Sequence, residues 1–429
     1  MDLNFYDIFA GICVALVVFL VLLILFEPGL KYRIKPRPLA IDSQEFLQLL
    51  GALCDAEVRA CGAVKVLKNG TSFYTEELKA ISEARESVNL EAYIFHKGKV
   101  AKDFVDALAE RARSGVRVKL VVDAVGSLTT KDSYFKPLRD AGGHVKWYQP
   151  LRLATFKRWN NRTHRKVIVI DGRTAFCGGA DIADEWLYDR DGEKSWRDTV
   201  FRFEGDVVNG LQSTFAENWL EASGKILADA DYFPLTRDRV PNPQTDCSAI
   251  VVNSTPSAAR GTRAHILYQT LMAYASKSLL ITTPYFLPDR STLCEILRAK
   301  ERGVRVVVLV PGVHSDHLFT RVSSRRRYGD LLKAGVELYE YSPSMIHAKT
   351  MVVDGIWSVV GSSNFDNRSL GLNDEVNVAI HNAALAGQLE EDFRCDLEKS
   401  RQISYEQWSK RPVHEKLMES FFRIFDRQI

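Results

Sequence analysis

The strongest constraint on the fold is a motif that the chain contains twice. The sequence THRKVIVIDG occupies residues 163–172, and IHAKTMVVDG occupies residues 346–355. Other landmarks recur at a similar separation, because a Gly-Val-Arg-Val begins at residue 115 and again at residue 303. Matches that keep their order and spacing over so long a stretch indicate an internal duplication.

Each half of the chain alternates strand-like and helical patterns. In the first half, apolar runs at residues 87–95 and 116–122 flank a helical pattern at residues 101–115. This alternation predicts an α/β fold. With 429 residues, 46% hydrophobic and 26% charged, the chain is long enough for two or three globular domains. The predicted divisions are a first lobe at 41–228, a Pro- and Asp-rich linker at 229–247, and a second lobe at 248–429 that ends in a C-terminal helix.

The N-terminus contains a charge-free apolar run from Ile8 to Phe26. At the helical rise its 19 residues extend roughly 28 Å, which matches the hydrocarbon core of a bilayer. We therefore predict that residues 1–40 form a transmembrane anchor followed by a basic connector. Lys31, Arg33 and the two basic residues that follow them lie after the run, and none lies before it. This bias places the catalytic body on the cytoplasmic side.

The spacing inside the repeated motif separates its residues by role. On a strand, His164 and Lys166 project from one face, whereas Asp171 lies seven residues after the histidine and projects from the other. Only the histidine and lysine are expected to share a substrate, and the Asp before Gly is better placed to hold backbone amides of a turn. The second copy has the same spacing, with His347, Lys349 and Asp354.

Two histidines and two lysines suit phosphodiester chemistry. A neutral imidazole can attack phosphorus, a protonated one can donate to the departing alkoxide, and lysines can balance the charge of the phosphate. This chemistry requires no metal and no cofactor, and the sequence has no metal-ligand spacing. Each imidazole needs a partner to fix its tautomer. Candidates are Asp198, 34 residues after His164, and Glu375, 28 residues after His347.

The paired motifs resemble those of the phospholipase D superfamily, and stretches such as ITTPYFLPD (281–289) resemble bacterial cardiolipin synthases. The resemblance implies two duplicated phospholipase D-type lobes related by a pseudo-twofold, each a mixed β-sheet flanked by helices, after one transmembrane helix. It also implies that His164 is the nucleophile and His347 the general acid and then base. Position 181 departs from the family pattern, because Asp181 stands where an Asn is usual. The residues implied as catalytic are His164, Lys166, Asp171, His347, Lys349 and Asp354, supported at the phosphate by Asn364, Ser362, Asp198 and Glu375.

The implied activity is phosphatidyl transfer at a bacterial inner membrane. Two phosphatidylglycerol molecules would give cardiolipin and glycerol, and phosphatidylethanolamine is a second candidate substrate. A hydrolytic phospholipase D, or another phosphodiesterase or nuclease of the superfamily, remains the alternative. The net charge of +3 and the predicted membrane span argue against a nucleic-acid partner.

An insertion in the first copy, LRLATFKRWNNR at residues 151–162, places basic residues beside Phe156 and Trp159. Contact with anionic lipid headgroups and an ordinary basic surface loop are both consistent with this composition.

Overall fold

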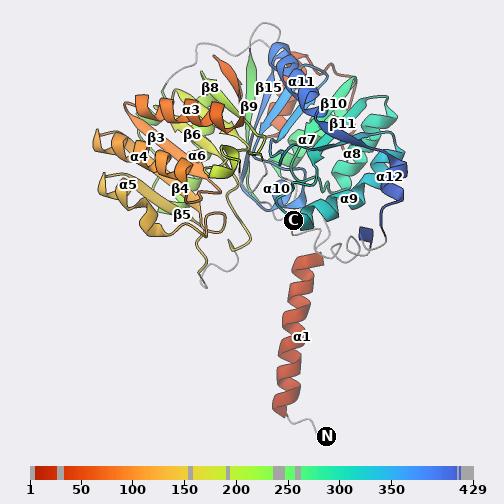
Figure 1. Ribbon diagram of the computed structural model, residues 1–429, viewed down its shortest axis with the longest axis horizontal. Helices are drawn as coiled ribbons and strands as arrows, with labels where there is room; N and C mark the ends of the chain where they lie inside the picture. Colours follow the sequence, from red (N-terminus) through yellow and green to blue (C-terminus); the bar gives the residue numbers. More distant parts are fainter. Residues whose placement is uncertain are drawn as a thin grey trace.

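The computed structural model describes residues 5–26, 33–152, 158–189, 194–234, 247–256, 262–412 and 415–416. They form a helix that projects from a two-lobed body (Figure 1). Most of the predicted linker and the predicted C-terminal helix beyond residue 416 lie outside the described residues.

The first lobe contains a seven-stranded mixed sheet in the order β2-β8-β7-β6-β3-β4-β5. The strands β3, β4 and β5 at one end of the sheet are parallel, and the other pairings are antiparallel. The strands are β2 (Val64–Lys68), β3 (Ser87–Ala92), β4 (Arg117–Asp123), β5 (His144–Tyr148), β6 (Val167–Ile170), β7 (Thr174–Gly178) and β8 (Thr199–Glu204). The helices are α3 (Asn69–Glu83), α4 (Lys99–Arg113), α5 (Lys136–Asp140) and α6 (Val207–Ser223), with short 3-10 turns at Asp132–Phe135, Asp184–Trp186 and Ala230–Tyr232.

The second lobe repeats this plan in a nine-stranded sheet, β1-β9-β15-β14-β13-β10-β11-β12-β16. Strands β10, β11 and β12 are parallel, as their counterparts β3, β4 and β5 are. The strands are β9 (Ser248–Ser254), β10 (Ser278–Thr282), β11 (Arg305–Pro311), β12 (Glu337–Tyr341), β13 (Thr350–Val353), β14 (Trp357–Gly361), β15 (Glu375–His381) and β16 (Ser400–Ile403). The helices are α7 (Arg263–Tyr274), α8 (Arg290–Glu301), α9 (Leu318–Lys333), α10 (Asn367–Gly371), α11 (Ala383–Leu397) and α12 (Tyr405–Ser409).

Residues 44–60 precede the sheet of the first lobe in the chain but pack against the second lobe. Helix α2 (Gln44–Leu53) buries Phe46 in the second lobe, where its ring meets Trp357 edge to face at 5.9 Å. Strand β1 (Val58–Ala60) pairs antiparallel with β9. The predicted first lobe, residues 41–228, includes both elements by chain order, but α2 is buried in the second core and Val58 of β1 packs, partly buried, against that core.

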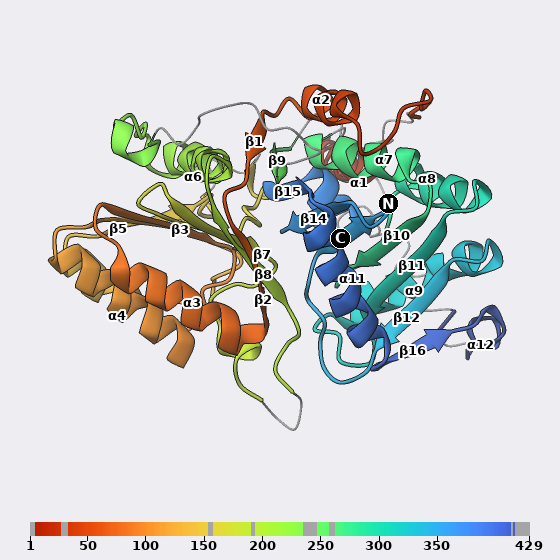
Figure 2. The same cartoon turned by 90° about the horizontal axis from the view of Figure 1, so that it is seen from above.

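The two sheets pack against each other through apolar side chains. Val167 and Phe201 of the first lobe share one buried cluster with Val251, Val352 and Val376 of the second. Figure 2 shows the two lobes side by side, with α3 and α4 on the outer face of the first sheet and α11 between the lobes. Close-packed faces of this kind resist sliding, so the packing fixes the position of one motif relative to the other.

Helix α1 (Phe5–Phe26) covers the predicted membrane span and extends away from the body (Figure 1). Within the described part of the chain, which includes the side chains of Tyr6 and residues 9–19 of this helix, no helix has the length and apolarity needed to cross a membrane. The predicted span is therefore not confirmed.

Candidate active site

The two histidines lie where the lobes meet. His164 precedes β6, and its backbone N–H donates to the carbonyl of Asp374 in the second lobe at 2.8 Å. His347 precedes β13, and its backbone N–H donates to the carbonyl of Arg197 in the first lobe at 2.7 Å. Each histidine segment is thus joined by main-chain hydrogen bonds to the other lobe.

Each histidine is also oriented by a carboxylate that comes from the other lobe. Nδ1 of His164 lies 3.0 Å from Oε1 of Glu375, and Nδ1 of His347 lies 3.0 Å from Oδ2 of Asp198. The sequence identified both carboxylates but assigned each to the histidine of its own lobe, so the pairing is the reverse of the expected one. The reversal follows from the main-chain hydrogen bonds at Asp374 and Arg197, because the next residue in each case is the carboxylate.

This arrangement leaves Nε2 of each imidazole for chemistry. Burial, followed by the charges of nearby lysines, holds the pKa of His164 well below its ordinary 6.5. Burial also lowers the pKa of His347, and the charge of Lys349 adds to the effect. Both imidazoles are therefore neutral near pH 7, which is the form that can attack phosphorus or accept a proton.

Both carboxylates are fully buried, and they respond differently to burial. Burial raises the pKa of Glu375, whose Oε2 accepts a hydrogen bond from the Ser362 hydroxyl. Burial alone would raise the pKa of Asp198 as well, but the hydrogen bond from His347 and the charge of Lys349 outweigh it and hold that pKa below 3.8. Ser362, expected at the phosphate, is instead engaged with Glu375.

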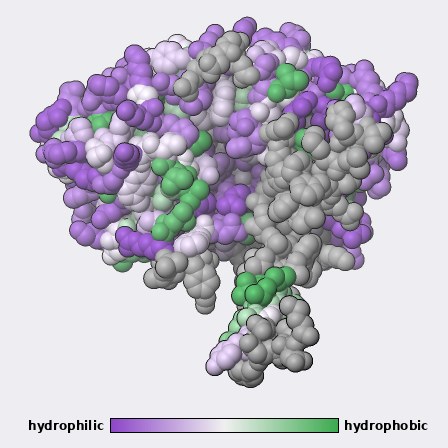
Figure 3. Space-filling view, turned by 60° about the horizontal axis from the view of Figure 1, so that its bottom comes forward, coloured by the Kyte–Doolittle hydropathy of each residue, from purple (hydrophilic) through white to green (hydrophobic). Residues whose placement is uncertain are grey.

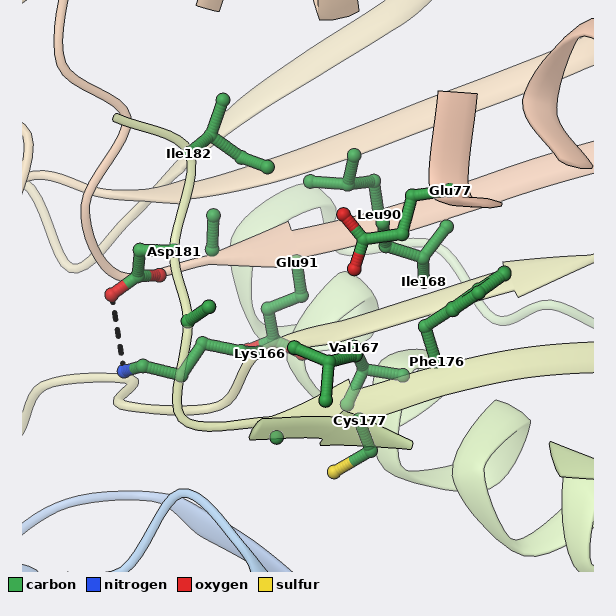
Figure 4. Close-up of a pocket in the computed structure, with 14 residues that line it drawn as sticks. Glu77, Leu90, Glu91, Lys166, Val167, Ile168, Phe176, Cys177, Asp181 and Ile182 are labelled. Carbon is green, nitrogen blue, oxygen red and sulfur yellow. Dashed lines mark ion pairs between the residues drawn. The ribbon is translucent and has the colours of Figure 1, made fainter. Parts of the chain in front are cut away.

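The two lysines have unequal surroundings. Lys166 forms an ion pair with Asp181 at 3.3 Å and lies over the ring of Tyr93 (Figure 4). No carboxylate among the described residues forms an ion pair with Lys349, and burial lowers its pKa to about 7. Its Nζ lies 3.0 Å from Nε2 of His347. The first half of the site therefore contains an internally neutralised lysine, and the second half does not.

The residues at positions 181 and 364 contribute to this difference. Asp181 accepts the backbone N–H of Tyr93 at 3.0 Å with one oxygen and faces Lys166 with the other. Asn364 is buried, and no donor of the described residues reaches its side-chain oxygen. The side chain of Asn364 is thus available to a ligand, whereas that of Asp181 is already occupied.

A small cavity lies behind Lys166 in the first lobe, between α3 and the sheet. Lys166 and Asp181 lie at one end of it and Glu77 at the other (Figure 4). Burial raises the pKa of Glu77 well above 4.5, which favours the neutral form of this carboxyl.

The structure does not bring the aspartates of the repeated motif to the histidines. Asp171 follows β6 with a φ of 52° and accepts the backbone N–H groups of Glu86 and Ser87, both at 2.8 Å, at the start of β3. Asp354 does the same for Lys277 and the start of β10. As expected, these aspartates hold backbone amides, but the amides belong to a distant segment and not to the adjacent turn.

Four aromatic residues around the histidines were not identified from the sequence. Tyr93 lies 5.2 Å from the His164 ring, and Trp186, Trp196 and Tyr285 lie 5.3, 5.4 and 6.5 Å from that of His347. The indole N–H of Trp186 donates to Asp198 at 2.9 Å. The signals in the sequence were the closeness of Trp196 to Asp198 and the position of Tyr285 within the stretch ITTPYFLPD at residues 281–289. Among the described residues, no group of three or more His, Cys, Asp or Glu side chains could hold a metal ion.

The duplicated α/β lobes and the shared histidine site define a phospholipase D-like enzyme. A family model described as the PLD-like domain of cardiolipin synthase matches twice, at residues 78–217 and 268–397. The major cardiolipin synthase of Bacillus subtilis (strain 168) is 34% identical over 89% of this chain and 79% of its own length. A cardiolipin synthase of Geobacillus sp. (strain WCH70) is 32% identical over 93% of this chain and 79% of its own.

The chain belongs to the cardiolipin synthase family of phospholipase D-like enzymes. The fold also matches the crystal structure of phosphatidylserine synthase from Haemophilus influenzae Rd KW20, with a TM-score of 0.72, 17% identity, and coverage of 90% of this chain and 100% of that one. This likeness confirms the two-lobed mixed α/β fold.

Proposed function

We propose that this enzyme transfers a phosphatidyl group from one phosphatidylglycerol to a second, giving cardiolipin and glycerol. The observation that supports the proposal best is the exchange of carboxylates, since each histidine is oriented by the opposite lobe within one buried centre. Similarity to proteins named cardiolipin synthase supports the choice of lipid substrates.

In the first step, Nε2 of His164 attacks the phosphorus of phosphatidylglycerol. His347 takes up a proton at Nε2 as the anionic lipid binds, and its ion pair with Asp198 stabilises this imidazolium form. The bond from phosphorus to the headgroup oxygen then breaks, and His347 donates that proton to the oxygen as glycerol departs. Neutral His164, with Nδ1 held by Glu375, is suited to the attack. The choice of His164 as nucleophile comes from the family resemblance.

In the second step, His347 accepts the proton of a hydroxyl on a second phosphatidylglycerol. That oxygen attacks the phosphorus, the bond to Nε2 of His164 breaks, and cardiolipin leaves. Lys349 and the side-chain amide N–H of Asn364 are the proposed donors to the phosphate oxygens, because no carboxylate among the described residues pairs with either of them. Water in place of the lipid hydroxyl would give hydrolysis to phosphatidic acid.

The purified full chain in detergent, given phosphatidylglycerol with a labelled headgroup and phosphate, tests this function. We expect labelled cardiolipin and free glycerol in equal amounts without CTP, and no turnover by His164→Ala or His347→Ala. Phosphatidic acid as the only lipid product would assign the enzyme to the hydrolases. Added phosphatidylethanolamine would reveal a second acceptor or donor as a mixed product.

We further propose that α1 anchors the body to the cytoplasmic face of the inner membrane, with the N-terminus outside. The charge-free apolar run and the basic residues after it support this orientation. The chain should stay in membranes washed with alkaline carbonate, and a protease added outside intact spheroplasts should leave the body uncut. Release by carbonate would contradict the anchor.

A further inference from the structure

Exposed apolar side chains gather around the mouth of the proposed site. Outside α1, nine large apolar side chains of the described residues are exposed, and four of them lie on loops that follow parallel strands. We call these four the rim. They are Leu128 after β4, Leu151 and Trp159 after β5, and Val313 after β11, with exposed fractions of 72%, 52%, 39% and 69%.

The loop that carries Leu128 is attached to the His164 half of the site. The hydroxyl of Ser127 accepts the backbone N–H of Phe95 at 2.8 Å and donates to the carbonyl of Tyr93 at 2.9 Å. The ring of Tyr93 lies 5.2 Å from that of His164. Leu128 is therefore an exposed side chain whose neighbour, Ser127, is connected to the proposed nucleophile through Tyr93.

The loops of Val313 and Trp159 complete the rim on the other sides. Three residues after Val313, Asp316 accepts the hydroxyl of Tyr285 at 2.6 Å, and the ring of Tyr285 lies 6.5 Å from that of His347. Next to Trp159, Asn160 accepts a hydrogen bond from Arg368 of the second lobe at 2.9 Å. Loops of both lobes thus present apolar side chains at one mouth.

The surroundings of the rim suit an anionic lipid surface. Arg152 and Arg158 are exposed beside Leu151 and Trp159, and mixed aromatic and basic side chains favour the headgroup region of a bilayer. Figure 1 shows α1 leaving one side of the body, and Figure 3, turned so that this side comes forward, shows apolar side chains gathered on the first lobe. A protein seated on the rim would cover the mouth and exclude the substrate.

We propose that the rim is a bilayer-docking surface that enters the headgroup region of an anionic membrane and holds the mouth of the site against it. The inference rests on the proposed function, because it assumes that the substrate enters the site from the bilayer. Docking lets a lipid headgroup reach the histidines directly from the bilayer, by a short path that does not cross water. It goes beyond anchoring, since α1 alone would leave the orientation of the body free.

The test measures the activity of the full chain on two substrates. Long-chain phosphatidylglycerol is presented in vesicles into which the protein is reconstituted. A short-chain form is presented to the protein in detergent, at a concentration below that at which this lipid aggregates. Leu128→Asp and Val313→Asp should each lower the rate on long-chain phosphatidylglycerol in vesicles about tenfold, because a charge replaces a side chain of leucine or valine size that would be buried. The rate on soluble dihexanoyl phosphatidylglycerol should change less than twofold. Equal rates on vesicles for wild type and both variants would overturn the proposal, and so would equal losses on the two substrates.

Ile226→Asp is the matched control. Ile226 is 75% exposed and follows α6, whose Trp219 lies 6.5 Å from His144 at the first residue of β5. Ile226 therefore lies near the amino ends of the parallel strands, whereas the rim lies at their carboxyl ends. Its substitution should leave both rates unchanged. A vesicle-specific loss in this variant equal to that of the rim variants would also refute the assignment of the surface.

Hydrogen exchange of the wild-type full chain provides a readout that does not depend on turnover. Amides of residues 124–131 and 312–317 should exchange at least threefold more slowly in phosphatidylglycerol nanodiscs than in detergent. Unchanged exchange would overturn docking even if the variants failed to fold, and slowing that depended on protein concentration without lipid would indicate a second copy as the occupant. If neither substrate were turned over, the proposed function would fail while exchange still decided the docking.

Discussion

The exchange of carboxylates between lobes predicts which chemical step each one supports. Glu375→Gln should impair His164, the proposed nucleophile, although the two residues come from different lobes. Asp198→Asn should impair His347, the proposed acid and base. The pairing expected from the sequence would give the opposite assignment, so the two variants discriminate between the arrangements.

The size of the expected fall in kcat follows from the contacts at Nδ1 of His164. The two oxygens of Glu375 lie 3.0 and 3.2 Å from Nδ1 of His164, and the carboxylate is fully buried. A hydrogen bond to a charged group contributes about 1.5–3 kcal/mol, which is about 10- to 150-fold in rate. An amide can also donate to Nδ1 and select the tautomer that carries its proton on Nε2, and the comparable change in a Ser-His-Asp triad costs about 10⁴-fold. We therefore expect kcat to fall on the order of 10²- to 10⁴-fold.

A substrate with a good leaving group separates the two roles. Phosphatidyl p-nitrophenol needs little protonation as it departs, so a defect in the general acid should be relieved and a defect in the nucleophile should not. Formation of p-nitrophenol, measured by stopped flow, should recover at least tenfold relative to phosphatidylglycerol for Asp198→Asn and stay low for Glu375→Gln. Recovery by Glu375→Gln instead would refute the assignment of roles, and intact circular dichroism of both variants controls for folding.

Three further predictions concern acidic residues. Asp181→Asn removes the partner of Lys166 but keeps an acceptor for the backbone of Tyr93, so the KM for phosphatidylglycerol in steady-state assays should fall about threefold to tenfold as the freed charge attracts phosphate; an increase would show that the ion pair serves binding. Asp171→Ala leaves three backbone N–H groups without their acceptor and should lower the free energy of unfolding in urea by about 2–4 kcal/mol, with kcat of the folded enzyme unchanged; a loss of kcat alone would place it in the chemistry. Burial raises the pKa of Glu91 from 4.5 to about 7. Its carboxyl group therefore costs the folded protein nothing below pH 4.5, where it is protonated in both states, and the free energy of unfolding falls as the pH rises through 7. Glu91→Gln should therefore be the more stable protein above pH 7, by on the order of 3 kcal/mol, and equal to wild type near pH 4; a pH-independent difference would contradict this explanation.

The sequence predicted the parts of the structure that depend on local pattern. Alternation of strands and helices gave the α/β class, and the duplicated landmarks gave two lobes, both confirmed by the two sheets and the paired family matches. The expected separation of His164 and Lys166 from Asp171 is found, although His164 and Lys166 precede β6 and do not lie on the strand as predicted. Contacts between distant segments were not predictable, because they depend on how two sheets pack through many weak apolar contacts. The amides held by Asp171 lie more than eighty positions earlier in the chain, and no periodicity in the sequence connects them.

The crossed site explains why both copies of the motif are needed in one chain. A first lobe alone would contain His164 without Glu375, and a second lobe alone would contain His347 without Asp198. Each half would then have an imidazole of unfixed tautomer beside a buried carboxylate without a partner, which is costly in a site of low dielectric. Docking of the sheets therefore stabilises the fold and assembles the chemistry in the same step. The lobes differ at the equivalent positions of Asp181 and Asn364: Asp181 neutralises Lys166 within its own lobe, whereas Lys349 has no ion-pair partner among the described carboxylates.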